Sequence, residues 1–295
     1  MIIKALRDQG CKKINFAGGE PFLPDYTSNT KKTTDLGEMV KFAKMECGFE
    51  SVSIISNGRF ITEAWMRQYH PYLDVLGVSC DSANDSTNKA IGRGNGQHVS
   101  YVRQAADLCR QFSVPFKLNT VVCSLNWEED LSELLADTTP MRWKIFQVLG
   151  LEGENKGADT KRNVTPFLIS DEQFRSFVER HQGKVADPSV MKVEDNDTMQ
   201  SSYVLVAEYG RFLDSSTGAK LATRSILEVG VKVAWAELEA STGGGFDQEA
   251  FERRDGNFFD PADVATTRPG SGCTGCSMAE SGGASEIADI EDLLG

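Results

Sequence analysis

Between residues 13 and 148, five short apolar runs rich in β-branched residues alternate with segments of helical periodicity. The strand-like runs are 13–17, 51–56, 75–79, 115–122 and 142–148; the helical patterns are 2–9, 35–46, 64–69, 98–112 and 127–135, the last after a cap at Asn126. Such alternation is typical of parallel sheets and barrels. Because the chain begins within a helical pattern, we expect an α/β barrel that lacks its first strand.

The sequence after residue 150 is less regular, and it suggests three regions. Residues 1–165 are predicted to form the truncated barrel core. Residues 166–264 are predicted to be a C-terminal region that packs on the barrel, with a helix from Ser170 to about Arg180 and a polar stretch over 182–200. Residues 265–295 are rich in Gly, Ser and Thr and are predicted to be a disordered tail.

The composition argues against several classes of protein. There are 43 acidic and 31 basic residues, a formal net charge of -12, whereas sequence-independent binding of a nucleic acid polymer requires a basic surface. No apolar run is long enough for a membrane span, so we expect an intracellular, cytoplasmic protein. Among the seven cysteines only Cys273 and Cys276 have metal-ligand spacing, without a second pair, so no metal site is expected in this chain.

Small polar residues follow three of the strand-like runs. These are Gly18, Gly19 and Glu20 after the first run, Ser56 and Asn57 at the end of the second, and Ser79-Cys80-Asp81-Ser82 at the end of the third. In parallel barrels, functional groups gather at the carboxyl ends of the strands. The two glycines permit close backbone approach, and Glu20 offers a counter-charge for the ammonium group of a cofactor. Ordinary turn and capping chemistry is the alternative for any one cluster.

Three of the runs carry polar residues two positions apart, namely Lys13 with Asn15, Lys117 with Asn119, and Arg142 with Lys144. This spacing places both members of a pair on one face of a strand. If that face lines a barrel, four cations lie where burial is costly without anions, and a nucleoside triphosphate would satisfy them. Pairing with acidic residues of the barrel is the alternative. Arg93, in an Ile-Gly-Arg-Gly segment, either reaches the same site or caps a helix.

Six segments carry a specific resemblance. They are Lys-Ile-Asn-Phe-Ala-Gly-Gly-Glu-Pro-Phe-Leu at 13–23, Ser-Val-Ser-Ile-Ile-Ser-Asn-Gly at 51–58, Ser-Cys-Asp-Ser at 79–82, Ile-Gly-Arg-Gly at 91–94, Arg-Trp-Lys-Ile-Phe-Gln at 142–147 and Leu-Glu-Gly-Glu-Asn at 151–155. Together they resemble the viperin family of radical S-adenosylmethionine (SAM) enzymes. The resemblance extends over about residues 1–264.

The resemblance implies a partial (βα)6 TIM-like barrel that cleaves SAM at a [4Fe-4S] cluster. It also implies conversion of CTP, or a related nucleotide, to the 3′-deoxy-3′,4′-didehydro nucleotide, a chain terminator in antiviral defence. By position, SAM binding is assigned to Gly18, Gly19, Glu20, Ser56, Asn57, Ser79 and Arg93. Nucleotide binding is assigned to Lys13, Lys117, Asn119, Arg142, Lys144 and Tyr203. The strand spacing alone indicates five of these six.

The chain departs from the family pattern at several points. The family's Cys-x3-Cys-x2-Cys cluster loop has no counterpart here, so we expect an inactive chain, either a truncated reading of the gene from an internal Met or a naturally shortened form. Ala17 replaces a family serine, which leaves the nucleotide choice open. Iron-sulfur delivery machinery is a partner that the family implies, although its C-terminal Trp is absent. The upstream membrane-binding helix of animal relatives is also absent, so attachment to the endoplasmic reticulum is not inferred.

Two other interpretations remain open. The first is a cluster-free nucleotide-binding pseudoenzyme, since the binding residues are present without the cluster ligands. The second is an aldolase-type barrel with Lys117 or Lys144 as a Schiff base. It leaves Gly18 to Glu20 without a role, and borohydride trapping would test it.

Overall fold

The computed structural model describes residues 1–23, 36–150, 155–156, 163–185, 187–199, 204–213, 222–241 and 275–279, with 197–198 and 275–279 described by their backbone. Within these residues a nine-stranded sheet has the order β6-β5-β4-β3-β2-β1-β9-β7-β8. The strands are β1 (Lys13–Ala17), β2 (Ser51–Ser56), β3 (Val75–Ser79), β4 (Phe116–Val122), β5 (Arg142–Gln147), β6 (Met191–Glu194), β7 (Leu205–Val206), β8 (Phe212–Leu213) and β9 (Gly275–Ala279). Among the named strands of the described residues, β7 and β8 pair antiparallel and all other pairs are parallel. The five predicted strands correspond to β1 to β5, and the α/β class is confirmed.

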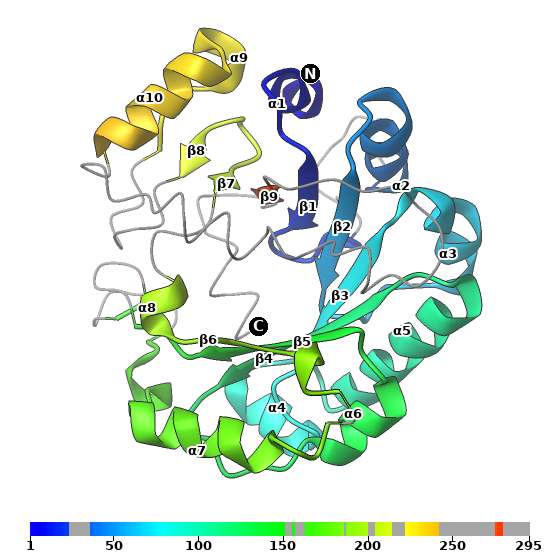
Figure 1. Ribbon diagram of the computed structural model, residues 1–295, viewed down its shortest axis with the longest axis vertical. Helices are drawn as coiled ribbons and strands as arrows, with labels where there is room; N and C mark the ends of the chain where they lie inside the picture. Colours follow the sequence, from blue (N-terminus) through cyan, green and yellow to red (C-terminus); the bar gives the residue numbers. More distant parts are fainter. Residues whose placement is uncertain are drawn as a thin grey trace.

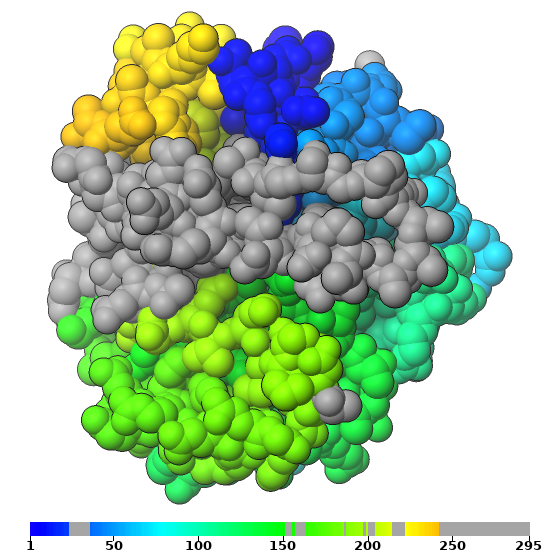
Figure 2. Space-filling view, viewed as in Figure 1, coloured from blue at the N-terminus to red at the C-terminus, as the bar shows by residue number. Residues whose placement is uncertain are grey.

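Most of the described helices cover the outer side of the sheet. The helices of the described residues are α1 (Ile2–Asp8), α2 (Leu36–Lys41), η1 (Phe42–Glu46), α3 (Glu63–Tyr69), η2 (His70–Tyr72), α4 (Asp85–Ile91), α5 (His98–Phe112), α6 (Ser132–Thr138), η3 (Thr165–Phe167), α7 (Asp171–His181), η4 (Pro188–Val190), α8 (Asn196–Met199), α9 (Ile226–Val229) and α10 (Val231–Ser241). Figure 1 shows the strands along an arc, with α2, α3, α5, α6 and α7 outside it. Helix α9 contacts α1, and Figure 2 shows α9 and α10 in yellow beside α1 in blue. None of the described helices is long and apolar enough to cross a bilayer.

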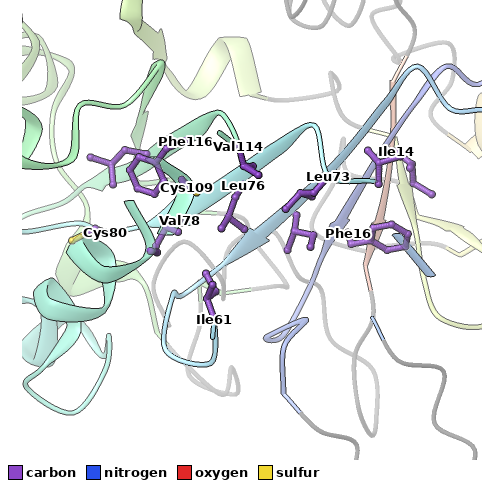
Figure 3. Close-up of a cluster of buried hydrophobic side chains, with 14 of the residues drawn as sticks. Ile14, Phe16, Ile61, Leu73, Leu76, Val78, Cys80, Cys109, Val114 and Phe116 are labelled. Atoms are coloured by element: carbon purple, nitrogen blue, oxygen red, sulfur yellow. The ribbon is translucent and has the colours of Figure 1, made fainter. Parts of the chain in front are cut away.

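One face of the strands packs against the helices and forms the main hydrophobic core. Its strand residues recur at every second position, because successive side chains of a strand point to opposite faces. They include Ile14, Phe16, Val52, Ile54, Leu76, Val78, Phe116, Leu118, Trp143 and Ile145, several of which are drawn in Figure 3. Trp143 is fully buried, and its ring lies 5.1 Å from that of His181 in α7. The intervening residues therefore face the concave side of the arc.

Two helices begin at a side-chain cap, and one predicted cap does not begin a helix. The Thr62 hydroxyl accepts a hydrogen bond from the Trp65 N–H at 3.2 Å, and Ser170 forms a reciprocal capping box with Gln173. The prediction that Asn126 caps a helix over 127–135 is wrong. Asn126 is fully buried and its amide donates to the carbonyls of Asp81 and Val121, so the helix begins only at Ser132.

Strands β6 and β9 lie where no strand was predicted. Strand β6 falls in the polar stretch 182–200. It was not predicted because its sequence, Met-Lys-Val-Glu, alternates apolar and polar residues over only four positions. Strand β9 falls within residues 265–295, whose predicted disorder stays a prediction. Its backbone pairs in parallel with β1 on the edge opposite β2.

Candidate functional site

The Gly18-Gly19-Glu20 segment turns sharply at the carboxyl end of β1. Both glycines have positive φ, 102° and 50°, which side chains disfavour. The Glu20 carboxylate reaches the end of β2, where Oε1 accepts from the Ser56 hydroxyl at 2.7 Å and Oε2 from the Asn57 N–H at 2.7 Å. The Phe22 N–H donates to Oε1 at 3.1 Å. The structure therefore brings five of the predicted cofactor residues to one lip.

Burial raises the pKa of Glu20, and the hydrogen bonds from Ser56, Asn57 and Phe22 oppose that rise. An ionised carboxylate offers about four acceptor positions, of which these three donors use three. The remaining position can take a further donor, and a cation there would offset the cost of burial. Glu20 is thus suited to an ammonium group, as the chemistry of a SAM methionine end requires.

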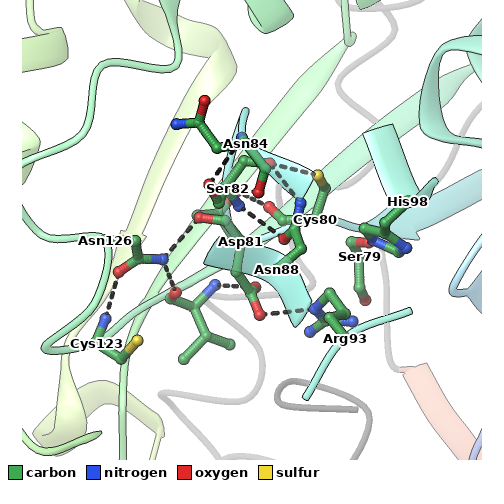
Figure 4. A network of polar contacts seen from close by, with 12 residues as sticks. Ser79, Cys80, Asp81, Ser82, Asn84, Asn88, Arg93, His98, Cys123 and Asn126 are labelled. Atoms are coloured by element: carbon green, nitrogen blue, oxygen red, sulfur yellow. Dashed lines mark hydrogen bonds and ion pairs between the residues drawn. The ribbon is translucent and has the colours of Figure 1, made fainter. Parts of the chain in front are cut away.

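The other two predicted cofactor residues, Ser79 and Arg93, belong to a buried network at the end of β3 (Figure 4). Arg93 is fully buried, and its Nε donates to Asp81 Oδ2 at 2.6 Å. Asp81 Oδ1 accepts from the Val121 N–H of β4 at 2.9 Å. Asp81 therefore ties the Arg93 guanidinium to the sheet, and the loop after α4 holds Arg93 rather than leaving it free to move.

His98 lies beside Arg93 and is neutral near pH 7. Burial, with the nearby charge of Arg93, lowers the pKa of His98 to about 4. Its Nε2 lies 2.8 Å from the Ser79 carbonyl oxygen, and a carbonyl only accepts, so Nε2 carries the proton. His98 thereby fixes the backbone at Ser79. Neither His98 nor Asp81 was predicted as a site residue, although Asp81 stands in the polar cluster that ends β3.

The predicted nucleotide residues of β4 and β5 lie on the concave face. Lys117 pairs with Arg142 and Asn119 with Lys144 in the β4–β5 register, so both pairs share a face opposite to Trp143. All four side chains are buried, between 4% and 8% exposed. Asn119 Oδ1 has no hydrogen-bond partner among the described residues. These four residues are called the cation face below.

The remaining predicted nucleotide residues are placed less directly. Lys13 is buried at the start of β1, which β2 and β3 separate from β4 in the sheet. Tyr203 lies outside the described residues. Lys144 has an acidic partner that the sequence did not reveal, because Glu194 of β6 lies 2.5 Å from its Nζ and is itself buried. The alternative of acidic pairing therefore applies to Lys144.

The described residues do not fit an iron-sulfur cluster. Cys11, Cys47, Cys80, Cys109 and Cys123 carry free thiols. No group of three possible metal ligands occurs among the residues that the structure describes. Burial raises the pKa of Cys80 and Cys109 to about 12, and thiols that resist ionisation are poor metal ligands. These side chains therefore support no chemical step through a cluster.

Comparison with known proteins gives consistent matches. Residues 1–136 match the Radical SAM superfamily. The S-adenosylmethionine-dependent nucleotide dehydratase RSAD2 of Siniperca chuatsi is 41% identical over 258 residues, which cover 87% of this chain and 68% of that protein. The S-adenosylmethionine-dependent nucleotide dehydratase of Flammeovirga pacifica is 33% identical over 258 residues, which cover 86% of this chain and 80% of that protein. Among solved structures, anSMEcpe with bound AdoMet has a TM-score of 0.56 at 16% identity, over 85% of this chain and 70% of that one, which supports the fold.

Proposed function

The chain belongs to the S-adenosylmethionine-dependent nucleotide dehydratases of the radical SAM superfamily, and from this premise we propose that it binds SAM beside a nucleoside triphosphate, namely CTP. The reaction of the family is dehydration of the nucleotide to a 3′-deoxy-3′,4′-didehydro product that serves antiviral defence, and we propose that the described residues supply the ligand binding for that reaction but no cluster ligands. The relationship to the family supports the type of reaction, and the residues on the concave face of the sheet support nucleotide binding.

The observation that carries the proposal is the cation face. Lys117, Arg142 and Lys144 are buried on two neighbouring strands, with Lys117 in register with Arg142 and Asn119 in register with Lys144. Buried cations are costly unless anions accompany them. Within the described part of the chain Glu194 brings a carboxylate to Lys144, whereas a triphosphate offers several negative oxygens in a row to the whole face. A polyanion is the ligand class that best matches this face.

The lip formed by Gly18, Gly19 and Glu20 is the proposed seat of the SAM methionine end. The glycines allow a close backbone approach, and Glu20 offers a free acceptor position to the ammonium group. Arg93 and Ser79 lie at the end of β3 in the same row of strand ends, as expected for the other side of that ligand. When bound, SAM supplies the group that abstracts hydrogen in the reaction of the family.

Nucleotide binding without turnover is the second candidate. The thiols of Cys80 and Cys109, whose pKa burial raises to about 12, favour it because protonated thiols are poor metal ligands. Both candidates use the same binding residues, so a binding experiment tests the shared part. Detection of the didehydro product after anaerobic reconstitution with iron and sulfide would favour the dehydratase, and its absence beside intact ligand binding would favour the binder.

Isothermal titration of SAM and CTP against single variants tests the two assignments separately. We expect Arg142→Ala to weaken CTP binding roughly tenfold or more, because it removes a charge-assisted hydrogen bond, and to leave SAM binding within about twofold. Glu20→Ala should do the reverse. Arg103→Ala, on the exposed side of α5, is the matched control. Equal losses of both ligands in the Arg142 and Glu20 variants would contradict the assignment.

A further inference from the structure

Strand β6 adds two charged residues to the concave side of the sheet, Lys192 and Glu194. They stand two positions apart, the same spacing that marks Lys117 with Asn119 and Arg142 with Lys144. Lys144 pairs with Lys192 in the β5–β6 register, and Phe146 pairs with Glu194. Because residues in register share a face, Lys192 lies on the same face as Lys144.

The surroundings of β6 agree with this placement. Met191, the residue before Lys192, packs against the main core on the helix side, so Lys192 points the other way. Glu194, two positions after Lys192, lies on the same face, because its carboxylate is 2.5 Å from Lys144 Nζ on the concave side. Asn119, Lys144 and Lys192 therefore form one row across β4, β5 and β6.

Lys192 differs from Lys144 in its partners. Lys144 is buried and paired with Glu194, whereas Lys192 is half-buried and makes no hydrogen bond or ion pair with another described residue. The charge of Lys192 helps to lower the pKa of Asp187. The two carboxylate oxygens of Asp187 accept hydrogen bonds from the N–H and the hydroxyl of Ser189, each at 2.8 Å, and among the described residues Asp187 forms no ion pair with Lys192. The ammonium group of Lys192 is therefore available to a ligand.

We propose that Lys192 binds the terminal phosphate of the nucleotide and so selects triphosphates over shorter nucleotides. This inference rests on the proposed function. The ribose must lie near the SAM seat at the end of β1, and β6 is the parallel strand furthest from β1 in that direction of the sheet. The phosphate furthest from the ribose accordingly meets the cation furthest along the row. Partial exposure lets this cation stay solvated until the ligand arrives, which a fully buried lysine could not do.

The test compares CTP, CDP and CMP by isothermal titration. We expect Lys192→Met to weaken CTP binding roughly tenfold and CMP binding less than about twofold, so that the preference of the wild type for CTP over CMP shrinks by about fivefold to tenfold. Lys192→Arg should keep the preference, which separates loss of charge from loss of fold. Lys232→Met, on the exposed side of α10, removes the same charge elsewhere and should change nothing.

The outcomes are distinguishable. If Lys192→Met lowers the affinities for CTP and CMP equally, or changes neither, the assignment of Lys192 is wrong while the cation face stands. If Arg142→Ala also leaves CTP binding unchanged, or if the wild type binds CTP no more tightly than CMP, the proposed function itself fails. Inorganic tripolyphosphate as a fourth ligand should lose affinity in Lys192→Met as CTP does, and an unchanged affinity there would also overturn the inference.

Discussion

Replacing Asp81 by Asn should destabilise the fold strongly, because it removes the buried carboxylate that pairs with the Arg93 guanidinium. The two side chains are 0% and 1% exposed and their Nε and Oδ2 atoms lie 2.6 Å apart. At an effective dielectric constant of about 20, two unit charges at about 4 Å attract by about 4 kcal/mol. Measured losses on removing one partner of a buried pair are about 3–5 kcal/mol. If Oδ1 of the new Asn still accepts from the Val121 N–H, its NH2 group faces the Arg93 Nε–H, so that two donors meet.

Urea unfolding at pH 7 without ligands measures this effect. We expect the free energy of unfolding to fall by about 3–5 kcal/mol in Asp81→Asn. Asp137→Asn makes the same chemical change in the ion pair with Arg103, whose two side chains are both 44% exposed, and should cost at most about 1 kcal/mol. The double variant Asp81→Asn/Arg93→Met should cost less than the sum of its single variants, because the two side chains contact each other and removing both also removes the buried charge that lost its carboxylate.

Equal costs in Asp81→Asn and Asp137→Asn would refute the reasoning, since burial is the only difference that it invokes. Additive costs in the double variant would refute it as well. The same variant also tests how Arg93 is positioned. If Asp81 holds the Arg93 guanidinium in place, Asp81→Asn should weaken SAM binding more than CTP binding. Both affinities are measured without urea, under conditions in which the variant is folded.

Two further predictions concern stability. Burial lowers the pKa of His98 to about 4, below the value of 6.5 in the unfolded chain, so the unfolded chain binds a proton at a higher pH than the folded protein does. The contribution of His98 to the free energy of unfolding is therefore fully present above pH 6.5. It should fall by roughly 3 kcal/mol as the pH drops to 4. Urea unfolding across this range should show a shallower slope in His98→Gln, and an unchanged slope would contradict the buried neutral ring. Ser170→Ala removes the capping box of α7 and should lower the free energy of unfolding by about 1 kcal/mol, whereas a change below the error of thermal or urea unfolding would show that packing alone holds the start of this helix.

Strands with strong local patterns were predictable. The runs that became β1 to β5 alternate residues of the core with residues of the concave face, so both their positions and the shared face of Lys117 with Asn119 follow from a period of two. The Gly18-Gly19-Glu20 lip was predictable for a similar local reason, because two glycines before a carboxylate mark a sharp turn at a strand end. Helix α7 begins at its predicted cap.

Features that depend on distant partners were not predictable. Strand β6 has four residues and only a partly buried face, so its pattern is indistinguishable from a polar loop until β5 pairs with it. Asn126 resembled a cap, but it is used to join two strand ends instead. Strand β9 has no local signal in its sequence, and it is defined by its parallel pairing with β1.

The sequence by itself determined the alternation of strands and helices, the glycine-lined lip and which residues of each strand share a face, because these depend on neighbours within a few positions. Only the tertiary structure decided that Glu194 pairs with Lys144, that Asp81 binds Arg93 and that Lys192 extends the row of Asn119 and Lys144. Each of these contacts joins residues from separate strands or loops. Their energies depend on burial and register, which exist only once the sheet has formed.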